Sequence, residues 1–121
     1  MHPIIIKRIY DEVSEDDGYR ILVDRLWPRG VSKERARLNE WNKNISPSPS
    51  LRKWFDHQED RFEEFGKRYT SELELQSEEL KRVKKIAETQ QLTLLYGAKD
   101  PKINHAVVLR KILKKKIASK K

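Results

Sequence analysis

Three short apolar segments, each bounded by charged or turn-forming residues, are typical of β-strands. The first covers residues 4–10, where β-branched and aromatic residues follow one another without a breaker. The second covers residues 19–26 and contains a continuous aliphatic run, which is typical of a strand covered on both faces. The third covers residues 92–96 and stops at Gly97. We therefore expect the second segment at or near the centre of a sheet.

Between the second and third strands, apolar residues recur at spacings of three and four, which places them on one face of a helix. The pattern occurs at Phe62, Phe65, Tyr69 and Leu73 and again at Leu80, Val83, Ile86 and Ala87. Acidic and basic residues occupy the opposite faces. Such faces are typical of core packing, and we expect this helical pair to cover the sheet.

Three further helix starts are predicted from residues that favour the N-cap position. Ser32 is expected to cap a short helix that reaches Trp41, and Ser50 is expected to cap another after a proline-rich break. Asp100 is followed by a proline, which lacks the N–H that the first helical turn leaves unpaired anyway. We therefore predict that the last helix begins at Asp100.

The order of these elements predicts the α/β fold class, with a small, mostly parallel sheet of about three strands covered by helices. A chain of 121 residues has the size of a single domain. Every charged residue from Arg110 onward is Lys or Arg. We assign residues 1–113 to the α/β domain and residues 114–121 to a basic C-terminal tail.

The amino-acid composition excludes several classes of function. The chain has 27 Lys and Arg against 19 Asp and Glu, a net charge of +8, and the excess comes mainly from the tail. Without cysteine, the protein has no disulfide, thiolate nucleophile or cysteine-ligated metal site. No apolar run approaches the ~20 residues of a membrane span, and residues 1–10 do not resemble a signal peptide. We expect a cytoplasmic protein that does not enter a membrane.

Polar clusters follow the second and third predicted strands. The members are Asp24, Arg25, Trp27 and Arg29 after the one strand and Tyr96, Lys99 and Asp100 after the other. Ligands of open α/β sheets bind beyond the carboxyl ends of the strands, so neighbouring strands would bring these clusters together. The cations would then surround a helix N-terminus, which itself favours negative charge. The sequence therefore predicts a pocket for a phosphate, a carboxylate or a nucleotide-like anion.

We assign roles to the residues of this pocket. The expected ligand-binding residues are Arg25, Arg29, Tyr96, Lys99 and Asn104. His105 is expected to stay neutral near the helix N-terminus, because the helix dipole and nearby cations penalise a further positive charge. Asp24 is expected to orient His105 or an arginine, or to act as a base. These two residues are the candidate catalytic groups, while enzyme activity and a cofactor are left open.

Each candidate also has a structural interpretation. Asp24 and Arg25 are residue types that also form ion pairs between loops, and His105 could be a capping or packing residue. Arg29 could be a solvated loop residue. His57 lies among acids and is interpreted as part of a solvated helix start, so we predict no metal site.

Several of these residues belong to longer motifs. They are VDRLWPRGV at 23–31, SPS at 46–48, LRKWF at 51–55, LLYGAKD at 94–100 and NHA at 104–106. Together they resemble the YeaO-like branch of the domain of unknown function 488 (DUF488) family over residues 4 to about 113. The resemblance implies a small intracellular α/β protein and no particular activity. Other branches carry a cysteine near the end of the last strand and Cys-His-Arg at the next helix, where this chain has Tyr96 and Asn104-His105-Ala106.

Two functional hypotheses of different classes follow. The preferred one is a pocket for a small anionic ligand at the carboxyl ends of the strands. The alternative is a nucleic-acid accessory module in which the basic tail supplies nonspecific affinity that weakens with salt. A third possibility, a purely structural partner-binding domain, has no distinctive apolar patch to support it.

Overall fold

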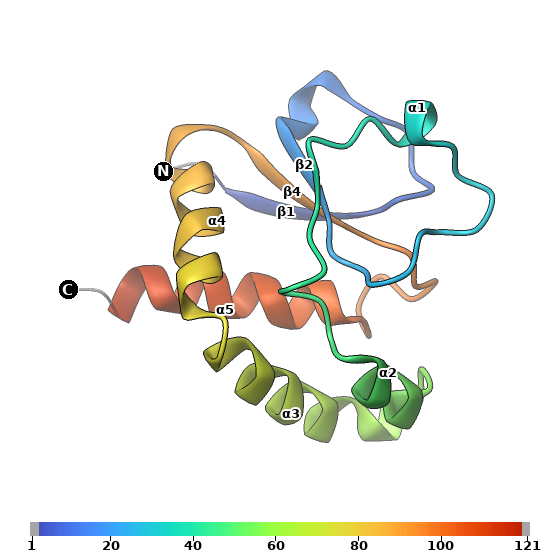
Figure 1. Ribbon diagram of the computed structural model, residues 1–121, viewed down its shortest axis with the longest axis vertical. Coiled ribbons are helices and arrows are strands. Elements are labelled where there is room, and N and C mark those ends of the chain that lie inside the picture. Colours follow the sequence, from blue (N-terminus) through green and yellow to red (C-terminus); the bar gives the residue numbers. More distant parts are fainter. Residues whose placement is uncertain (1–2, 120–121) are drawn as a thin grey trace.

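The computed structural model describes residues 3–119, with side chains described for residues 3–115. The strands are β1 (Ile4–Arg8), β2 (Tyr19–Leu22), β3 (Glu40–Trp41) and β4 (Leu92–Tyr96). The helices are α1 (Lys33–Ala36), α2 (Pro49–Phe55), α3 (Phe62–Glu74), α4 (Ser77–Thr89) and α5 (His105–Ser119), with 3-10 turns at Glu15–Asp17 and Glu59–Arg61. Figure 1 shows the sheet on one side of the molecule and α5 running beneath it.

All the strand pairs are parallel, in the order β1-β4-β2-β3. Both Ile4 of β1 and Tyr19 of β2 lie opposite Leu92 of β4, so the three strands begin at the same level. The predicted α/β class is confirmed, and so is the interior position of β2. The sheet has a fourth strand, β3, that the sequence pattern did not predict.

The predicted helix from Ser32 to Trp41 is wrong at its C-terminal end. Ser32 does cap α1, because its Oγ accepts the Arg35 N–H at 3.0 Å. The helix stops at Ala36, and the guanidinium of Arg20 donates to the Ala36 carbonyl at 2.7 Å, a group that would otherwise bond the next turn. The following residues pair with β2 instead, with Trp41 opposite Leu22. A long-range contact thus overrides the local preference.

Two predicted caps are also wrong in position. Ser48, not Ser50, caps α2, with its Oγ accepting the Leu51 N–H at 3.2 Å and a proline in the first helical position. Asp100 caps a tight turn rather than a helix, because its carboxylate accepts the N–H groups of Lys102 and Ile103 at 2.8 and 3.0 Å. The last helix, α5, begins only at His105.

The larger part of the core lies between the sheet and the helices. The helix α5 packs against β1 and β4, while α3 and α4 pack against α5. The predicted apolar faces are confirmed, because Phe65, Tyr69 and Leu80 are buried in one cluster with Ile21 and Leu94 of the strands. A smaller cluster covers the other face of the sheet. Its buried members are Ile9, Leu22, Val31, Ala36 and Leu95, with Trp27 and Trp41 packed against them.

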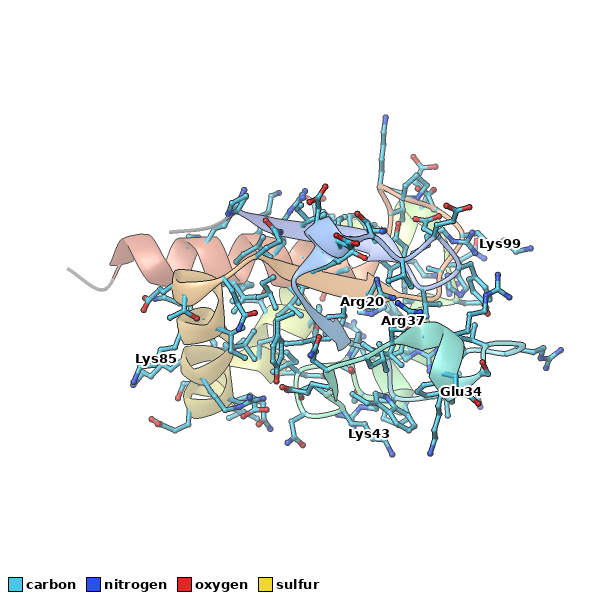
Figure 2. The ribbon with its side chains drawn as sticks, turned by 90° about the horizontal axis from the view of Figure 1, so that it is seen from above. Arg20, Glu34, Arg37, Lys43, Lys85 and Lys99 are labelled. Carbon is cyan, nitrogen blue, oxygen red and sulfur yellow. The ribbon has the colours of Figure 1, made fainter. Side chains whose placement is uncertain are left out.

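An ionic cluster also lies on this second face, and we call it the Asp17 cluster (Lys7, Asp17, Arg20 and Thr93). The Asp17 carboxylate contacts Lys7 Nζ at 3.0 Å and Arg20 at 2.5 Å, and the Asp17 carbonyl accepts the Thr93 hydroxyl at 2.7 Å. Burial would raise the pKa of Asp17, but the Ser14 N–H and the two cations together lower it. Figure 2 shows Arg20 between the sheet and α1.

Candidate functional site

A cleft of about 610 Å³ opens at the carboxyl ends of β2 and β4, beside the N-terminus of α5. Three parts of the chain form its walls. They are residues 24–29 after β2, the helix α2 with Pro47 before it, and a segment from Gly97 to the start of α5. The neighbouring parallel positions of β2 and β4 explain why segments about seventy residues apart meet here. This is the edge of the sheet where the sequence predicts a ligand.

A buried hydrogen-bond chain at the base of the cleft joins β2, β4 and α5. The His105 imidazole donates from Nε2 to the Val23 carbonyl at 2.6 Å and lies 3.5 Å from Asp24 Oδ1. The other carboxylate oxygen of Asp24 accepts the Gly97 N–H at 2.8 Å. His105 is 8% exposed, and burial lowers its pKa although the nearby Asp24 carboxylate opposes that shift. This shift favours the neutral imidazole at pH 7.

Arg25 shapes one wall of the cleft. Its Nε donates to the Pro47 carbonyl at 2.8 Å, and a terminal nitrogen donates to the Ser46 carbonyl at 3.4 Å. These bonds hold the segment that leads into α2 against the end of β2. Arg25 thus joins two loops, through backbone carbonyls and not through the ion pair considered from the sequence, and it still lines the cleft.

Three other cations line the cleft, and their side chains have no partner among the described residues. They are Arg29, Arg52 and Lys53. None of their side chains makes a hydrogen bond, an ion pair or a ring contact within the part of the chain that the structure describes. Arg52 is only partly exposed, and its charge helps to lower the pKa of His105 after the larger effect of burial. Asp24 is the single carboxylate among the described lining residues.

Comparisons with known proteins place the chain in a family. Residues 3–121 match a family model described as the inactive DUF488-N3 subclade. The uncharacterised protein YeaO of Escherichia coli (strain K12) is 50% identical over 103 residues, which are 85% of this chain and 90% of the relative. The chain is a YeaO-like member of the DUF488 family.

More distant relatives agree with this membership. The uncharacterised protein Rv3073c of Mycobacterium tuberculosis (strain ATCC 25618 / H37Rv) is 38% identical to this DUF488 chain over 108 residues, which are 89% of the chain and 91% of the relative. The uncharacterised protein Mb3100c of Mycobacterium bovis has the same identity and coverage. No solved structure matches the chain.

The cleft of this DUF488 protein contains most of the residues that the sequence singled out. Both candidate catalytic residues, Asp24 and His105, line it together with Arg25, Arg29 and Asn104. The Oδ1 of Asn104 accepts the Val107 N–H at 3.1 Å and its Nδ2 donates to the Asp100 carbonyl at 2.8 Å, and the side chain also interacts with the Tyr96 hydroxyl. Asn104 therefore caps α5 at the rim of the cleft.

Two predicted ligand-binding residues lie elsewhere. Tyr96 is buried in the main core cluster, because its position in β4 directs it to the face covered by helices. Burial, with a further contribution from the Asp11 carboxylate, raises the pKa of Tyr96. Lys99 is exposed in the turn after β4, and Figure 2 shows its side chain extending away from the protein. Neither residue lines the cleft.

Sequence reasoning missed the contribution of α2. Arg52 and Lys53 belong to the LRKWF motif, but nothing in their spacing predicted that α2 would face the ends of β2 and β4. His57 also reaches the cleft, in an exposed position with a φ of 54°. Among the described residues, no group of His, Asp and Glu side chains is arranged to hold a metal ion.

The basic C-terminal segment of the DUF488 chain continues α5 as far as Ser119. Lys114 and Lys115 are exposed, and the side chains of residues 116–121 lie outside the described residues. The separate tail at 114–121 and its binding of nucleic acid therefore stay predictions. None of the described helices has the length and apolarity needed to cross a membrane, and a cytoplasmic location also stays a prediction.

Proposed function

We propose that this DUF488 protein binds a small anion, a phosphate or nucleotide-like molecule, in the cleft beside α5. The observation that carries the proposal is Arg52, a half-buried residue that lines the cleft and whose side chain has no partner among the described residues. Taking a charge partly out of water costs free energy unless an opposite charge or a hydrogen bond compensates it. A bound anion supplies both.

The charge balance of the cleft supports the same proposal. Four cations, Arg25, Arg29, Arg52 and Lys53, face a single carboxylate, and that carboxylate already accepts a backbone N–H and lies beside His105. Guanidinium groups bind phosphate and carboxylate through paired N–H donors. The N-terminus of α5, a helix of 15 residues, adds a favourable dipole at the same edge.

Binding, rather than turnover, is the function we propose. The family description names an inactive subclade, and the chain has no cysteine to act as a nucleophile. The hydrogen bonds of Asp24 and His105 support a positioning role, in which the two residues hold the strand ends and α5 in the geometry that presents the cations.

The test is the stabilisation of the folded protein by anions. Inorganic phosphate and adenosine 5′-monophosphate are expected to raise the melting temperature, because a ligand at 100 times its Kd adds about 2.7 kcal/mol to the free energy of unfolding. Arg52→Ala and Arg29→Ala should each weaken binding at least several-fold, since a hydrogen bond to a charged group contributes about 1.5–3 kcal/mol.

The control is Lys85→Ala, which removes one positive charge from the exposed surface of α4. Figure 2 shows Lys85 on the side of the molecule opposite to Lys99 and the strand ends. An equal response to anions in Arg52→Ala, Lys85→Ala and wild type would show that binding takes place outside the cleft. No response in the wild-type protein would overturn the proposal.

A further inference from the structure

We infer that the ligand of this cleft is a phosphate monoester that carries a hydroxyl close to the phosphate, and that this hydroxyl donates a hydrogen bond to Nδ1 of His105. The inference rests on the proposed function and adds the chemical class of the ligand to it.

The surroundings of the imidazole decide where its proton lies. Nε2 faces the Val23 carbonyl at 2.6 Å, and a carbonyl oxygen only accepts hydrogen bonds. The second group near Nε2 is a carboxylate oxygen of Asp24 at 3.5 Å. Nε2 must therefore carry the proton, and in a neutral imidazole the lone pair is then on Nδ1. The protein itself selects this tautomer.

The second ring nitrogen is open to the cleft. No described residue donates a hydrogen bond to Nδ1, although His105 as a whole is more than nine-tenths buried. Among the described side chains, no fully buried nitrogen or oxygen lacks a partner, so Nδ1 must reach solvent. His105 lines the cleft, which gives Nδ1 its access to a ligand. His105, although buried, thus offers one unused hydrogen-bond acceptor to the cleft.

This acceptor changes what the cleft can recognise. The side chains of Arg25, Arg29, Arg52 and Lys53 supply donors and positive charge, which suit any phosphate or carboxylate. A fully ionised monoester phosphate has only lone pairs to offer, so it leaves Nδ1 without a partner and repels it at close range. A hydroxyl beside the phosphate satisfies Nδ1 while the phosphate contacts the cations. The combination favours a hydroxylated phosphate monoester over an anion that lacks a donor.

The electrostatics of the site agree with a neutral acceptor. Burial is the largest influence on the pKa of His105 and lowers it, and the charge of Arg52 acts in the same direction. The Asp24 carboxylate and the Val23 carbonyl raise the pKa and only partly offset this effect. Nδ1 therefore keeps its lone pair at neutral pH.

The experiment compares two monoesters that differ in this donor. At pH 8, where the second phosphate ionisation near pH 6 is complete, sn-glycerol 3-phosphate carries hydroxyls and n-propyl phosphate carries none. Calorimetric titration should give the first a Kd about 3–10-fold lower, the ratio expected for one net hydrogen bond. The two Kd values should become equal in His105→Gln, whose amide retains a donor for the Val23 carbonyl but offers no acceptor at the position of Nδ1.

The outcomes separate the two proposals. Equal Kd values in the wild-type protein, or a preference that persists in His105→Gln, would overturn the hydroxyl contact and leave anion binding intact. Binding of neither monoester would overturn the proposed function itself. Nitrogen-15 NMR of the imidazole is a second measurement that needs no variant, and it should show an unprotonated Nδ1. A proton on Nδ1 at pH 8 would contradict the inference directly.

Discussion

The two ends of β2 and β4 carry charged clusters with opposite properties. In the Asp17 cluster, near the start of these strands, the carboxylate has two cations, a backbone N–H and a deeply buried position. In the cleft, near the end of the same strands, Arg29, Arg52 and Lys53 have no partner among the described residues. The charges of the first cluster are satisfied within the chain, whereas those of the second are available to the ligand that we propose.

The architecture explains why the two ends differ. The turn at Glu15–Asp17 and the carbonyl groups at the end of α1 close over Arg20, so this end of the sheet has no room for a ligand. At the other end the strands point toward the beginning of α5 and toward α2, and a cleft remains between them. Parallel strands place all their carboxyl ends together, which concentrates the open site at one edge.

The largest expected effect is on the Asp17 cluster. Replacement of Arg20 by Met should lower the free energy of unfolding by about 3–5 kcal/mol, because it removes one of the two cations paired with the buried Asp17 carboxylate and also the donor to the Ala36 carbonyl. Urea denaturation measures this change, and the response to phosphate should be unaffected at temperatures where the variant is folded. Without ligand, Arg52→Ala should change the stability by no more than about 0.5 kcal/mol. Equal destabilisation by both substitutions would contradict the distinction between the clusters.

The next effect concerns how closely the chain packs at the start of β2 and β4. Gly18 has a φ of 65°, and a Cβ atom at this position would lie 2.3 Å from the Gln91 carbonyl oxygen. Gly18→Ala should therefore destabilise the protein by about 3 kcal/mol, since overpacking adds to left-handed backbone strain. Gly30 is the matched control, because it has a φ of 79° with no atom within 4 Å of the added Cβ. Gly30→Ala should cost only about 1 kcal/mol, and a similar loss in both variants would exclude the close contact.

The smallest effect is the pH dependence of stability, which should differ between His105 in the cleft and Asp17 in the Asp17 cluster. The folded protein binds a proton at His105 less readily than the unfolded chain, because burial lowers the pKa from its ordinary value of 6.5. Unfolding therefore takes up a proton, and the stability should fall as the pH decreases below about 6.5. Asp17 has a pKa below its ordinary value of 3.8, so its contribution is present above that pH and is lost only in stronger acid.

Melting temperatures between pH 8 and pH 3 measure both transitions. The decrease below pH 6.5 should disappear in His105→Gln, while the loss below pH 4 should remain. If the substitution leaves the decrease near pH 6.5 unchanged, His105 is not the group that titrates there.

Local patterns were sufficient for much of the fold. The spacing of Phe65 and Tyr69 predicted α3, and the apolar run around Ile21 predicted an interior strand, because burial on one helical face or on both strand faces leaves a direct pattern in the chain. The end of α1 could not be predicted in this way. It depends on the Arg20 guanidinium, which comes from a distant segment and takes the Ala36 carbonyl out of the helix.

In the candidate site, too, some features were predicted from local sequence patterns and others depended on contacts between remote segments. The polar residues that follow β2 and β4 pointed, from the sequence alone, to the edge of the sheet where the cleft lies, because the carboxyl end of a strand is a local feature. Only the tertiary structure brought Arg52 into the cleft, turned Lys99 away from it and left Nδ1 of His105 without a partner among the described residues. Side-chain direction and the presence or absence of a partner depend on groups that are remote in the chain, so packing alone decided which charged side chains line the cleft without a partner among the described residues.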